Sequence, residues 1–316
     1  MNLTAQIFIG DSRDSLRKLP DKSVQTIVTS PPYWGLRDYG HDGQIGLEQT
    51  PDEFIEQLCQ VFDEASRVLK DDGTIWVNLG DSYAGSGKGP AGNILKDTAA
   101  GEARHLESKH SAIVPDGLKP KDLVGIPWRF AFAMQARGWY LRQDIIWAKP
   151  NPMPESVTDR CTKSHEYIFL MSKNPKYYFD NEAIKEEAIT EPTVRDKNAE
   201  GYQADYSKGD RFSPGARVYG ADGKRNKRDV WTVNVKPYKE AHFATYPPEL
   251  IEPCILAGSK EGDIVLDPFS GSGTTGEVAL KHNRNYIGLE LNPEYAALSE
   301  KRLTSAIGMF GQVQVL

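Results

Sequence analysis

The stretch "IVLDPFSGSGTTG" (residues 264–276) decides the fold. The apolar run "IVLD" leads straight into a turn where Gly271, Gly273 and Gly276 form a G-x-G-x-x-G pattern. The next apolar run, "YIGLE", ends at Glu290. Glycines let a backbone approach an adenosine-type ligand closely, and an acidic residue at the end of the next strand binds ribose hydroxyls. The spacing therefore predicts a nucleotide-like cofactor, for which NAD is one candidate.

Too few residues follow Gly276 to complete a doubly wound sheet, so strands from the N-terminal part must complete it. Two apolar runs, residues 5–10 and 24–29, fit short buried strands. Asp11 follows the first run and would lie at the same edge as the glycine turn. We expect the glycine-rich strand to be late in sequence but central in the sheet.

Helices and strands alternate along the chain. Residues 50–73 fit a helix that ends at Gly73, and residues 74–80 fit the next strand. The runs 165–173 and 176–180 fit two further strands, which would form a terminal antiparallel hairpin. This order predicts an α/β fold with a doubly wound, mostly parallel sheet.

The strand at 24–29 stops at "TSPPYW" (residues 29–34). A proline has no N–H to give a sheet, and the residue before it is held extended. The result is a stiff turn that presents the Ser30 hydroxyl, the Pro31 carbonyl and a large aromatic ring. Because the carboxyl ends of parallel strands share one edge, we expect Ser30 and Gly271 in one crevice.

Composition narrows the protein class. The net charge of −6 argues mildly against nucleic-acid binding by the whole surface, although it does not exclude a local basic face. Three scattered cysteines are too few for a disulfide framework or a zinc site, which suits a reducing, cytoplasmic location. No apolar run has the length of a membrane span, and the N-terminal residues lack a signal-peptide pattern.

The chain resembles the beta-class, S-adenosylmethionine-dependent DNA amino-methyltransferases. "TSPPYW" is similar to the family's (D/N/S)PP(Y/F) catalytic motif and "DPFSGSGTT" to its cofactor motif, in the order that this class requires. "IIWAKPNPMPES", "HEYIFLMSK" and "HFATYPPELIEPCIL" are similar to later motifs. The likeness covers nearly the whole chain outside residues 82–120 and 181–235. It implies a circularly permuted, Rossmann-like methyltransferase fold with S-adenosylmethionine as the cofactor.

The resemblance also implies roles for individual residues. The Ser30 hydroxyl and the Pro31 carbonyl would accept the two N–H bonds of an exocyclic amine, Pro32 would hold them rigid, and Tyr33 would stack on a flipped base. Such a reaction needs no metal and no covalent nucleophile. Asp11 would contact the adenine and Asp267 the methionine part of the cofactor. The cofactor-binding candidates are Asp11, Thr245, Asp267, Phe269, Ser270, Gly271, Ser272, Gly273, Thr274 and Glu290.

The irregular part before residue 241 carries a local excess of positive charge. Residues 208–239 hold nine basic and three acidic side chains, a net of +6, with aromatic residues interleaved. This composition favours contact with phosphates and base edges over a simple charged loop. The DNA-binding candidates are Arg211, Arg217, Lys224, Arg225, Lys227 and Arg228.

We therefore expect a catalytic half at residues 1–180, a target-recognition insertion at 181–240 and a cofactor-binding half at 241–316. Within the first part, residues 82–120 fit either a mobile loop over the site or a plain surface excursion. The expected partners are double-stranded DNA and a restriction endonuclease acting on the same site, and the chain would be a monomer or a homodimer.

The first residue of the catalytic motif bears on the target base. Within the family, serine is commoner in enzymes that methylate the cytosine N4 amine and aspartate in adenine enzymes, so Ser30 favours cytosine N4 over adenine N6. The remaining alternatives are a protein-glutamine or RNA methyltransferase and an NAD-dependent dehydrogenase.

Overall fold

The computed structural model describes residues 3–35, 41, 43–85, 114–188, 193–195, 217–219, 223–235, 246–308 and 311–316. The chain divides into two compact units. The larger is made of Met1–Phe179 and Asp229–Leu316, and the smaller of Asp180–Arg228. No helix in these described ranges has the length and apolar character needed to cross a membrane.

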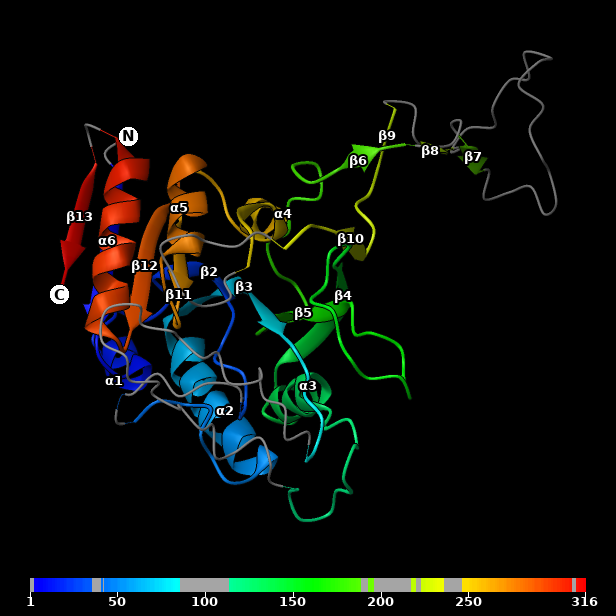
Figure 1. The fold of residues 1–316 in the computed structure, drawn as a ribbon. Coiled ribbons are helices and arrows are strands. Elements are labelled where there is room, and N and C mark those ends of the chain that lie inside the picture. Colours follow the sequence, from blue (N-terminus) through cyan, green and yellow to red (C-terminus); the bar gives the residue numbers. More distant parts are fainter. Residues whose placement is uncertain are drawn as a thin grey trace, which may run out of the picture. The chain divides into compact units, whose positions relative to one another are not determined.

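The described part of the larger unit contains a nine-stranded sheet in the order β10-β4-β5-β3-β2-β11-β12-β1-β13 (Figure 1). The strands are β1 (Thr4–Ile9), β2 (Val24–Thr29), β3 (Leu69–Leu79), β4 (Tyr140–Ala148), β5 (His165–Ser172), β10 (Val230–Thr232), β11 (Ile264–Asp267), β12 (Asn285–Glu290) and β13 (Gln312–Val315). Neighbouring strands are parallel except at β5, which is antiparallel to both β3 and β4. The predicted fold class is confirmed, because β11 lies between β2 and β12 in a mostly parallel sheet.

Helices cover both faces of this sheet (Figure 1). They are α1 (Ser12–Arg17), α2 (Pro51–Val68), α3 (Ile126–Ala136), α4 (Pro248–Gly258), α5 (Thr274–Lys281) and α6 (Pro293–Ile307). The first three pack against one another, as do the last three. In α2 the Thr50 hydroxyl accepts from the Glu53 N–H at 3.2 Å, and the Glu53 carboxylate accepts from the Thr50 N–H. This capping box fixes the start of α2 and the apolar face that it buries.

The predicted end of α2 is wrong. The helix ends at Val68, and β3 begins at Leu69, so Gly73 lies within the strand. A Cβ atom at Gly73 would lie 2.6 Å from Cγ of Leu69 and 2.8 Å from the Gln25 carbonyl oxygen. The glycine therefore permits a close approach between β3 and β2, rather than ending a helix.

The strand predicted at residues 176–180 is also wrong. The antiparallel partner of β5 on its outer side is β4, and β10 continues the sheet beyond it. Residues 176–180 instead pack along the sheet as irregular chain. The Tyr178 N–H donates to the Asp72 carbonyl at 2.8 Å, and Phe179 stacks on Trp76 with ring centroids 6.1 Å apart.

The reversed direction of β5 matters for the site. Leu79, at the carboxyl end of β3, pairs with Tyr167, and Trp147, near the end of β4, pairs with Glu166. The first residues of β5 therefore lie at the edge where the parallel strands end. Side chains from the start of one strand and the ends of its neighbours can meet there.

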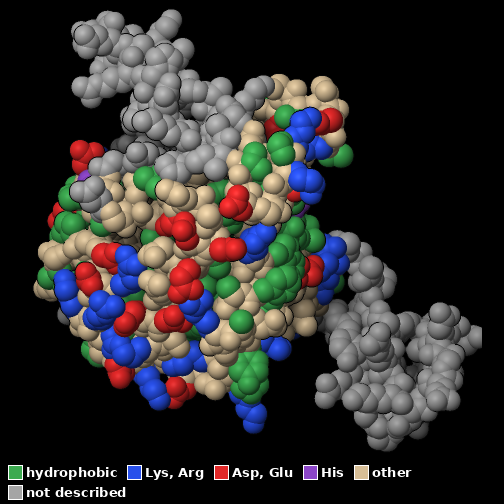
Figure 2. Space-filling view, turned by 90° about the horizontal axis from the view of Figure 1, so that it is seen from below, with side chains coloured by type: hydrophobic (Ala, Val, Ile, Leu, Met, Phe, Trp, Pro, Cys, Tyr) green, Lys and Arg blue, Asp and Glu red, His purple; other side chains and the backbone are tan. Residues whose placement is uncertain are grey.

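Acidic and basic side chains are interspersed on the face that Figure 2 shows. Ion pairs also join neighbouring helices, such as Arg17 of α1 with Glu64 of α2 at 3.2 Å and Arg137 after α3 with Glu56 at 2.8 Å. A mixed arrangement of this kind is typical of a solvated surface rather than of a phosphate-binding one.

The described residues of the smaller unit form two short antiparallel pairs. β6 (Glu186–Glu187) pairs with β9 (Lys224–Arg225), and β7 (Thr193–Arg195) pairs with β8 (Arg217–Tyr219). The Glu186 carboxylate accepts from the Nε atoms of Arg225 and Arg228, both at 2.9 Å.

Candidate functional site

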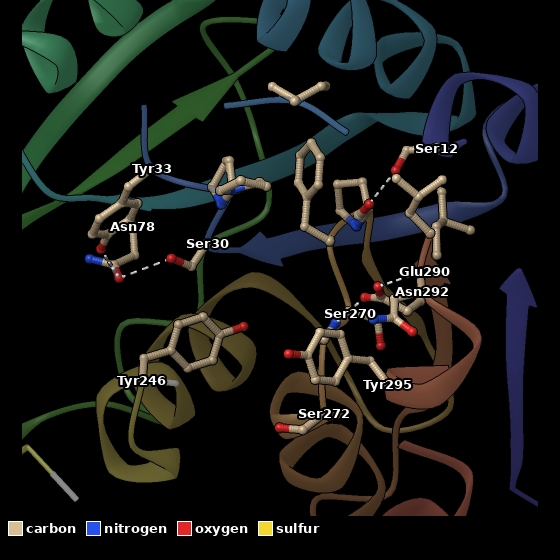
Figure 3. Close-up of a pocket in the computed structure, with 18 of the residues that line it drawn as sticks. Ser12, Ser30, Tyr33, Asn78, Tyr246, Ser270, Ser272, Glu290, Asn292 and Tyr295 are labelled. Atoms are coloured by element: carbon tan, nitrogen blue, oxygen red, sulfur yellow. Dashed lines mark hydrogen bonds between the residues drawn. The ribbon is translucent and has the colours of Figure 1, made fainter. Parts of the chain in front are cut away.

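A cavity of about 260 Å³ lies at the carboxyl edge of the sheet in the larger unit (Figure 3). The residues that follow β1, β2, β11 and β12 all contribute to its wall. Ser30 and Gly271 both line it, so the crevice expected from the sequence is present. The four catalytic candidates, Ser30, Pro31, Pro32 and Tyr33, lie together in this wall.

Glu290 forms one side of the cavity and is 9% exposed. Its Oε2 accepts from the Gly271 N–H at 2.7 Å, and its Oε1 accepts from the Asn292 N–H at 2.9 Å. Burial raises the pKa of this carboxyl. Each carboxylate oxygen can accept more than one hydrogen bond, so Glu290 can also bind ligand hydroxyls while it holds the turn.

The glycines of the turn have different surroundings. Gly271 has a φ of +52°, and no atom lies within 4 Å of the position that a Cβ would take. It therefore presents bare backbone to the cavity. A Cβ at Gly276 would lie 2.6 Å from Cδ2 of Leu303 and 2.6 Å from Cδ1 of Tyr286. Gly276 thus allows α5 to pack closely against α6 and β12. Gly273 is not among the described residues that line the cavity.

Asp267 is not among the described residues that line the cavity, although the sequence predicts that it contacts the cofactor. The carboxylate is 1% exposed and accepts from Thr29 Oγ1 at 2.5 Å, the Phe269 N–H at 3.0 Å, Thr275 Oγ1 at 2.6 Å and Tyr246 OH at 3.2 Å. Burial nevertheless raises its pKa. The geometry gives Asp267 a structural task, which is to tie β2, the glycine turn and α5 together, and the cofactor contact stays a prediction.

Asp11 lines the cavity at the start of α1. It caps the helix by accepting from the Arg13 N–H at 2.7 Å, and its Oδ2 binds Arg13 Nη2 at 2.6 Å. The Arg13 guanidinium lowers the pKa of Asp11, so this carboxylate is ionised. Ser12 follows it in the wall and donates to the Pro268 carbonyl at 2.5 Å.

The remaining cofactor candidates divide into two groups. Phe269, Ser270, Ser272 and Thr274 line the cavity, whereas Thr245 lies outside the described residues. Ser12, Asn292 and Tyr295 also line the cavity and were not predicted from the sequence. The two that follow Glu290 could have been found from their place after a strand end.

The other half of the cavity surrounds Ser30 and Tyr33 (Figure 3). Ser30 Oγ donates to Asn78 Oδ1 at 3.4 Å, and Tyr33 OH donates to Glu166 Oε2 at 2.7 Å. Gly80 lies under the tyrosine, because a Cβ there would be 2.6 Å from Cε2 of that ring. The stiff turn after β2 is therefore held by the end of β3 and the start of β5.

Asn78, Lys149 and Glu166 line this half of the cavity and were not predicted from the sequence. They come from β3, from the residue after β4 and from β5. Two of them stand in stretches that carry the family resemblance, "IIWAKPNPMPES" and "HEYIFLMSK". What the pattern lacked was the pairing of β5 with β3 and β4, which brings them together.

The DNA-binding candidates belong to the smaller unit. Lys224 and Arg225 form β9, and Lys227 and Arg228 follow it. Arg217 begins β8, and Arg211 lies outside the described residues. Most of the loop at 82–120 also lies outside them, but its ends meet where Tyr83 bridges to Leu123. In the described ranges, no group of three or more His, Cys, Asp or Glu side chains could hold a metal ion.

The carbon-5 cytosine mechanism uses a Pro-Cys thiol, and the chain has Pro253-Cys254. Cys254 is completely buried within α4 and is not among the described residues that line the cavity. Cys254 therefore belongs to the core of the larger unit.

Comparisons with known proteins agree with this geometry. The type II methyltransferase M.Cfr9I of Citrobacter freundii is 50% identical over 299 residues, which are 95% of this chain and 87% of that protein. The PvuII DNA methyltransferase, named as cytosine-N4-specific, has a TM-score of 0.64 at 18% identity and covers 100% of this chain and 96% of its own. A Thermus thermophilus protein crystallised with S-adenosyl-L-methionine has a TM-score of 0.60 at 24% identity, with 99% of both chains covered. These two structures support the fold.

The family follows from the sequence itself. Residues 24–301 match the N6_N4_Mtase family, described as DNA methylase. Methyl donation by S-adenosylmethionine, expected from the sequence, is the chemistry of this family. The turn after β2, the glycine turn after β11 and Glu290 all face one cavity, as that chemistry requires. The chain therefore belongs to the N6/N4 DNA methylase family and is a DNA methyltransferase.

Proposed function

We propose that the protein transfers a methyl group from S-adenosylmethionine to the N4 amine of cytosine in double-stranded DNA, after the base is flipped into the cavity. The observation that carries the proposal is that the catalytic candidates and most of the cofactor-binding candidates line one and the same cavity. Ser30 and Pro31 form one wall of the cavity, and Gly271 and Glu290 form another.

The exocyclic amine of a base is a poor nucleophile because its lone pair is delocalised into the ring. Two acceptors on its N–H bonds would free that lone pair, and the Ser30 hydroxyl and the Pro31 carbonyl are suitable acceptors. Because Ser30 already donates its hydrogen to Asn78 Oδ1, the lone pairs of its oxygen remain available to the amine. The ring of Tyr33 supplies a stacking surface for the flipped base.

The cofactor half fits S-adenosylmethionine. When bound, this cofactor supplies an electrophilic methyl group on a positively charged sulfur. Glu290 would accept hydroxyl groups of the ribose, and the bare backbone of Gly271 would permit a close approach. Phe269 would flank the adenine, and the negative charge of Glu290 favours a cationic ligand.

Ser30 supports cytosine over adenine. A serine is uncharged and reaches about one carbon less far than the aspartate that is commoner in adenine enzymes. The amine must then approach the turn more closely, and this difference in reach is a physical reason for the two motif types to discriminate between bases. Transfer to adenine N6 is the alternative.

DNA contact is proposed for residues 181–240, which would form the target-recognition insertion. This range includes nearly all of the smaller unit. Support comes from the cluster of basic residues around β9. Glu186 already pairs with Arg225 and Arg228, so phosphates would have to compete with it for these two side chains. The relative named a type II methyltransferase favours a cognate restriction endonuclease as a functional partner.

Nucleoside analysis tests the proposal. Purified protein is incubated with S-adenosylmethionine and unmethylated genomic DNA, which is then digested to nucleosides for mass spectrometry. The expected product is N4-methylcytosine. Recovery of N6-methyladenine alone would transfer the assignment to adenine, and no methylated nucleoside at all would reject DNA amine methylation.

A further inference from the structure

Glu166 joins three other side chains of the cavity wall. Its side chain is 14% exposed. Its Oε2 accepts from Tyr33 OH at 2.7 Å and from Asn78 Nδ2 at 3.3 Å, and its Oε1 pairs with Lys149 Nζ. All four residues line the cavity. A largely buried carboxylate with this many partners fixes the side chains that surround it.

The contacts come from four separate segments. Tyr33 follows β2, Asn78 lies in β3, Lys149 follows β4 and Glu166 is the second residue of β5. Only the antiparallel direction of β5 allows its beginning to meet the ends of the other strands. The function derived so far assigns no role to Glu166 or Lys149.

We propose that Glu166 is a positioning residue for methyl transfer. It holds the ring of Tyr33, sets the orientation of the Asn78 amide and balances the charge of Lys149. The inference rests on the proposed transfer to an exocyclic amine, and it holds for cytosine and adenine alike.

The orientation of Asn78 follows from its neighbours. Its Nδ2 lies 3.1 Å from the Tyr167 carbonyl oxygen and 3.3 Å from Glu166 Oε2, and both of these atoms can only accept. Its Oδ1 must therefore face Ser30 Oγ and Tyr33 OH, each at 3.4 Å. Glu166 thus orients the Asn78 amide, and this amide orients the Ser30 hydroxyl, which would accept an N–H bond of the base.

The charge of Glu166 has a second effect. The amine nitrogen would form its bond to the methyl carbon as the bond from that carbon to the cofactor sulfur breaks, and the nitrogen would carry positive charge until one of its protons passes to water. Lys149, whose Nζ lies 4.1 Å from the centre of the Trp147 ring, would oppose that charge if it were unbalanced. The ion pair with Glu166 keeps this wall of the cavity electrically neutral.

The test uses neutral variants of similar size, E166Q and K149M, and their double variant. Single-turnover transfer of labelled methyl groups to unmethylated genomic DNA is measured at saturating cofactor, with cofactor affinity determined by calorimetry. We expect E166Q to slow transfer roughly 10- to 100-fold, the effect of losing hydrogen bonds to a charged group. Cofactor affinity should stay within about twofold of that of the unmodified protein, since Glu166 lies in the half of the cavity that surrounds Ser30 and Tyr33. Adding K149M to E166Q should restore part of the rate.

The matched control is D263N. Asp263 is 19% exposed and pairs with Lys70 at 3.0 Å, just before the start of β11 and therefore at the opposite edge of the sheet. Its loss should lower thermal stability without slowing transfer. An E166Q protein as fast as the unmodified protein would overturn the inference. So would a slow E166Q protein that K149M slows further, because that result assigns Glu166 a merely structural task.

Two further outcomes are distinguished by the same measurements. If the unmodified protein transfers no methyl group to DNA, the proposed function fails rather than the role of Glu166. If E166Q does not fold by circular dichroism, Tyr33→Phe carries the test, because it keeps the ring and removes the hydroxyl that Glu166 holds. Unchanged transfer by that variant would then overturn the inference.

Discussion

Replacing Gly80 by alanine should displace the ring on which the flipped base is expected to stack. A Cβ at Gly80 would lie 2.6 Å from Cε2 and 3.2 Å from Cζ of Tyr33. Carbon atoms in contact prefer a separation of about 3.5–4.0 Å, so the ring must move by roughly 0.9 Å. The same movement strains the 2.7 Å bond from Tyr33 OH to Glu166. A misplacement of about 1 Å in an active site can cost about 100-fold in rate, or roughly 2.7 kcal/mol.

The assay is single-turnover methyl transfer to DNA, with cofactor affinity measured separately by calorimetry. Gly80→Ala should slow transfer about 100-fold and leave cofactor affinity unchanged, because the atoms nearest to its added Cβ all belong to Tyr33. Gly73→Ala is the matched control, since its Cβ would also lie 2.6 Å from a neighbouring carbon, Cγ of Leu69, but in the middle of β3, away from the carboxyl end of the strand. It should lower thermal stability and keep the rate at a temperature where the protein is folded. Wild-type transfer by a folded Gly80→Ala variant would refute the link between ring position and rate.

Three further predictions concern the two halves of the cavity and the smaller unit. Ser30→Ala should remove most methyl transfer while cofactor binding by calorimetry is unchanged, because the hydroxyl acts on the base; loss of both would contradict this role. Burial raises the pKa of Glu290 above its ordinary value of 4.5, so cofactor binding should weaken as the pH falls through that raised value. Glu290→Gln should bind the cofactor roughly 1.5–3 kcal/mol more weakly at pH 7 and lose this pH dependence, and an equal dependence in both proteins would argue against the assignment. Exchange of residues 180–228 for the matching segment of a relative should change the methylated DNA sequence and not the cofactor affinity, as bisulfite-independent sequencing can show; an unchanged target would locate recognition elsewhere.

The start of α2 and the end of β2 could be predicted from the sequence, because each depends on a few neighbouring residues. The capping box at Thr50 and Glu53 fixes the start of α2, and the prolines after Thr29 end β2. The end of α2 could not be predicted in the same way. Gly73 has the residue type of a helix end, yet close packing between β3 and β2 determines its place.

The cofactor half of the site was largely predictable for a related reason. Gly271 follows β11 and Glu290 ends the next strand in the chain, β12, so their spacing in the sequence reflects their distance in the fold. The base half is different, because Asn78 and Glu166 meet only through the pairing of β3 with β5. No spacing in the sequence specifies that pairing. The task of Asp267 was obscured too, since its partner Thr29 lies 238 positions away in the chain.

The pairing of β1 with strands from the far end of the chain delays completion of the sheet until those strands have been synthesised. The Thr4 N–H donates to Asn285 Oδ1, a contact between residues 281 positions apart, and both sheet neighbours of β1, β12 and β13, are made after that point. At about 5–20 residues per second, the ribosome needs roughly 14–56 s to supply them. Throughout that interval β1 has both of its hydrogen-bonding edges unpaired and its apolar side chains uncovered. Chaperone dependence of the nascent chain should therefore centre on β1, and it should end only when β12 leaves the ribosome.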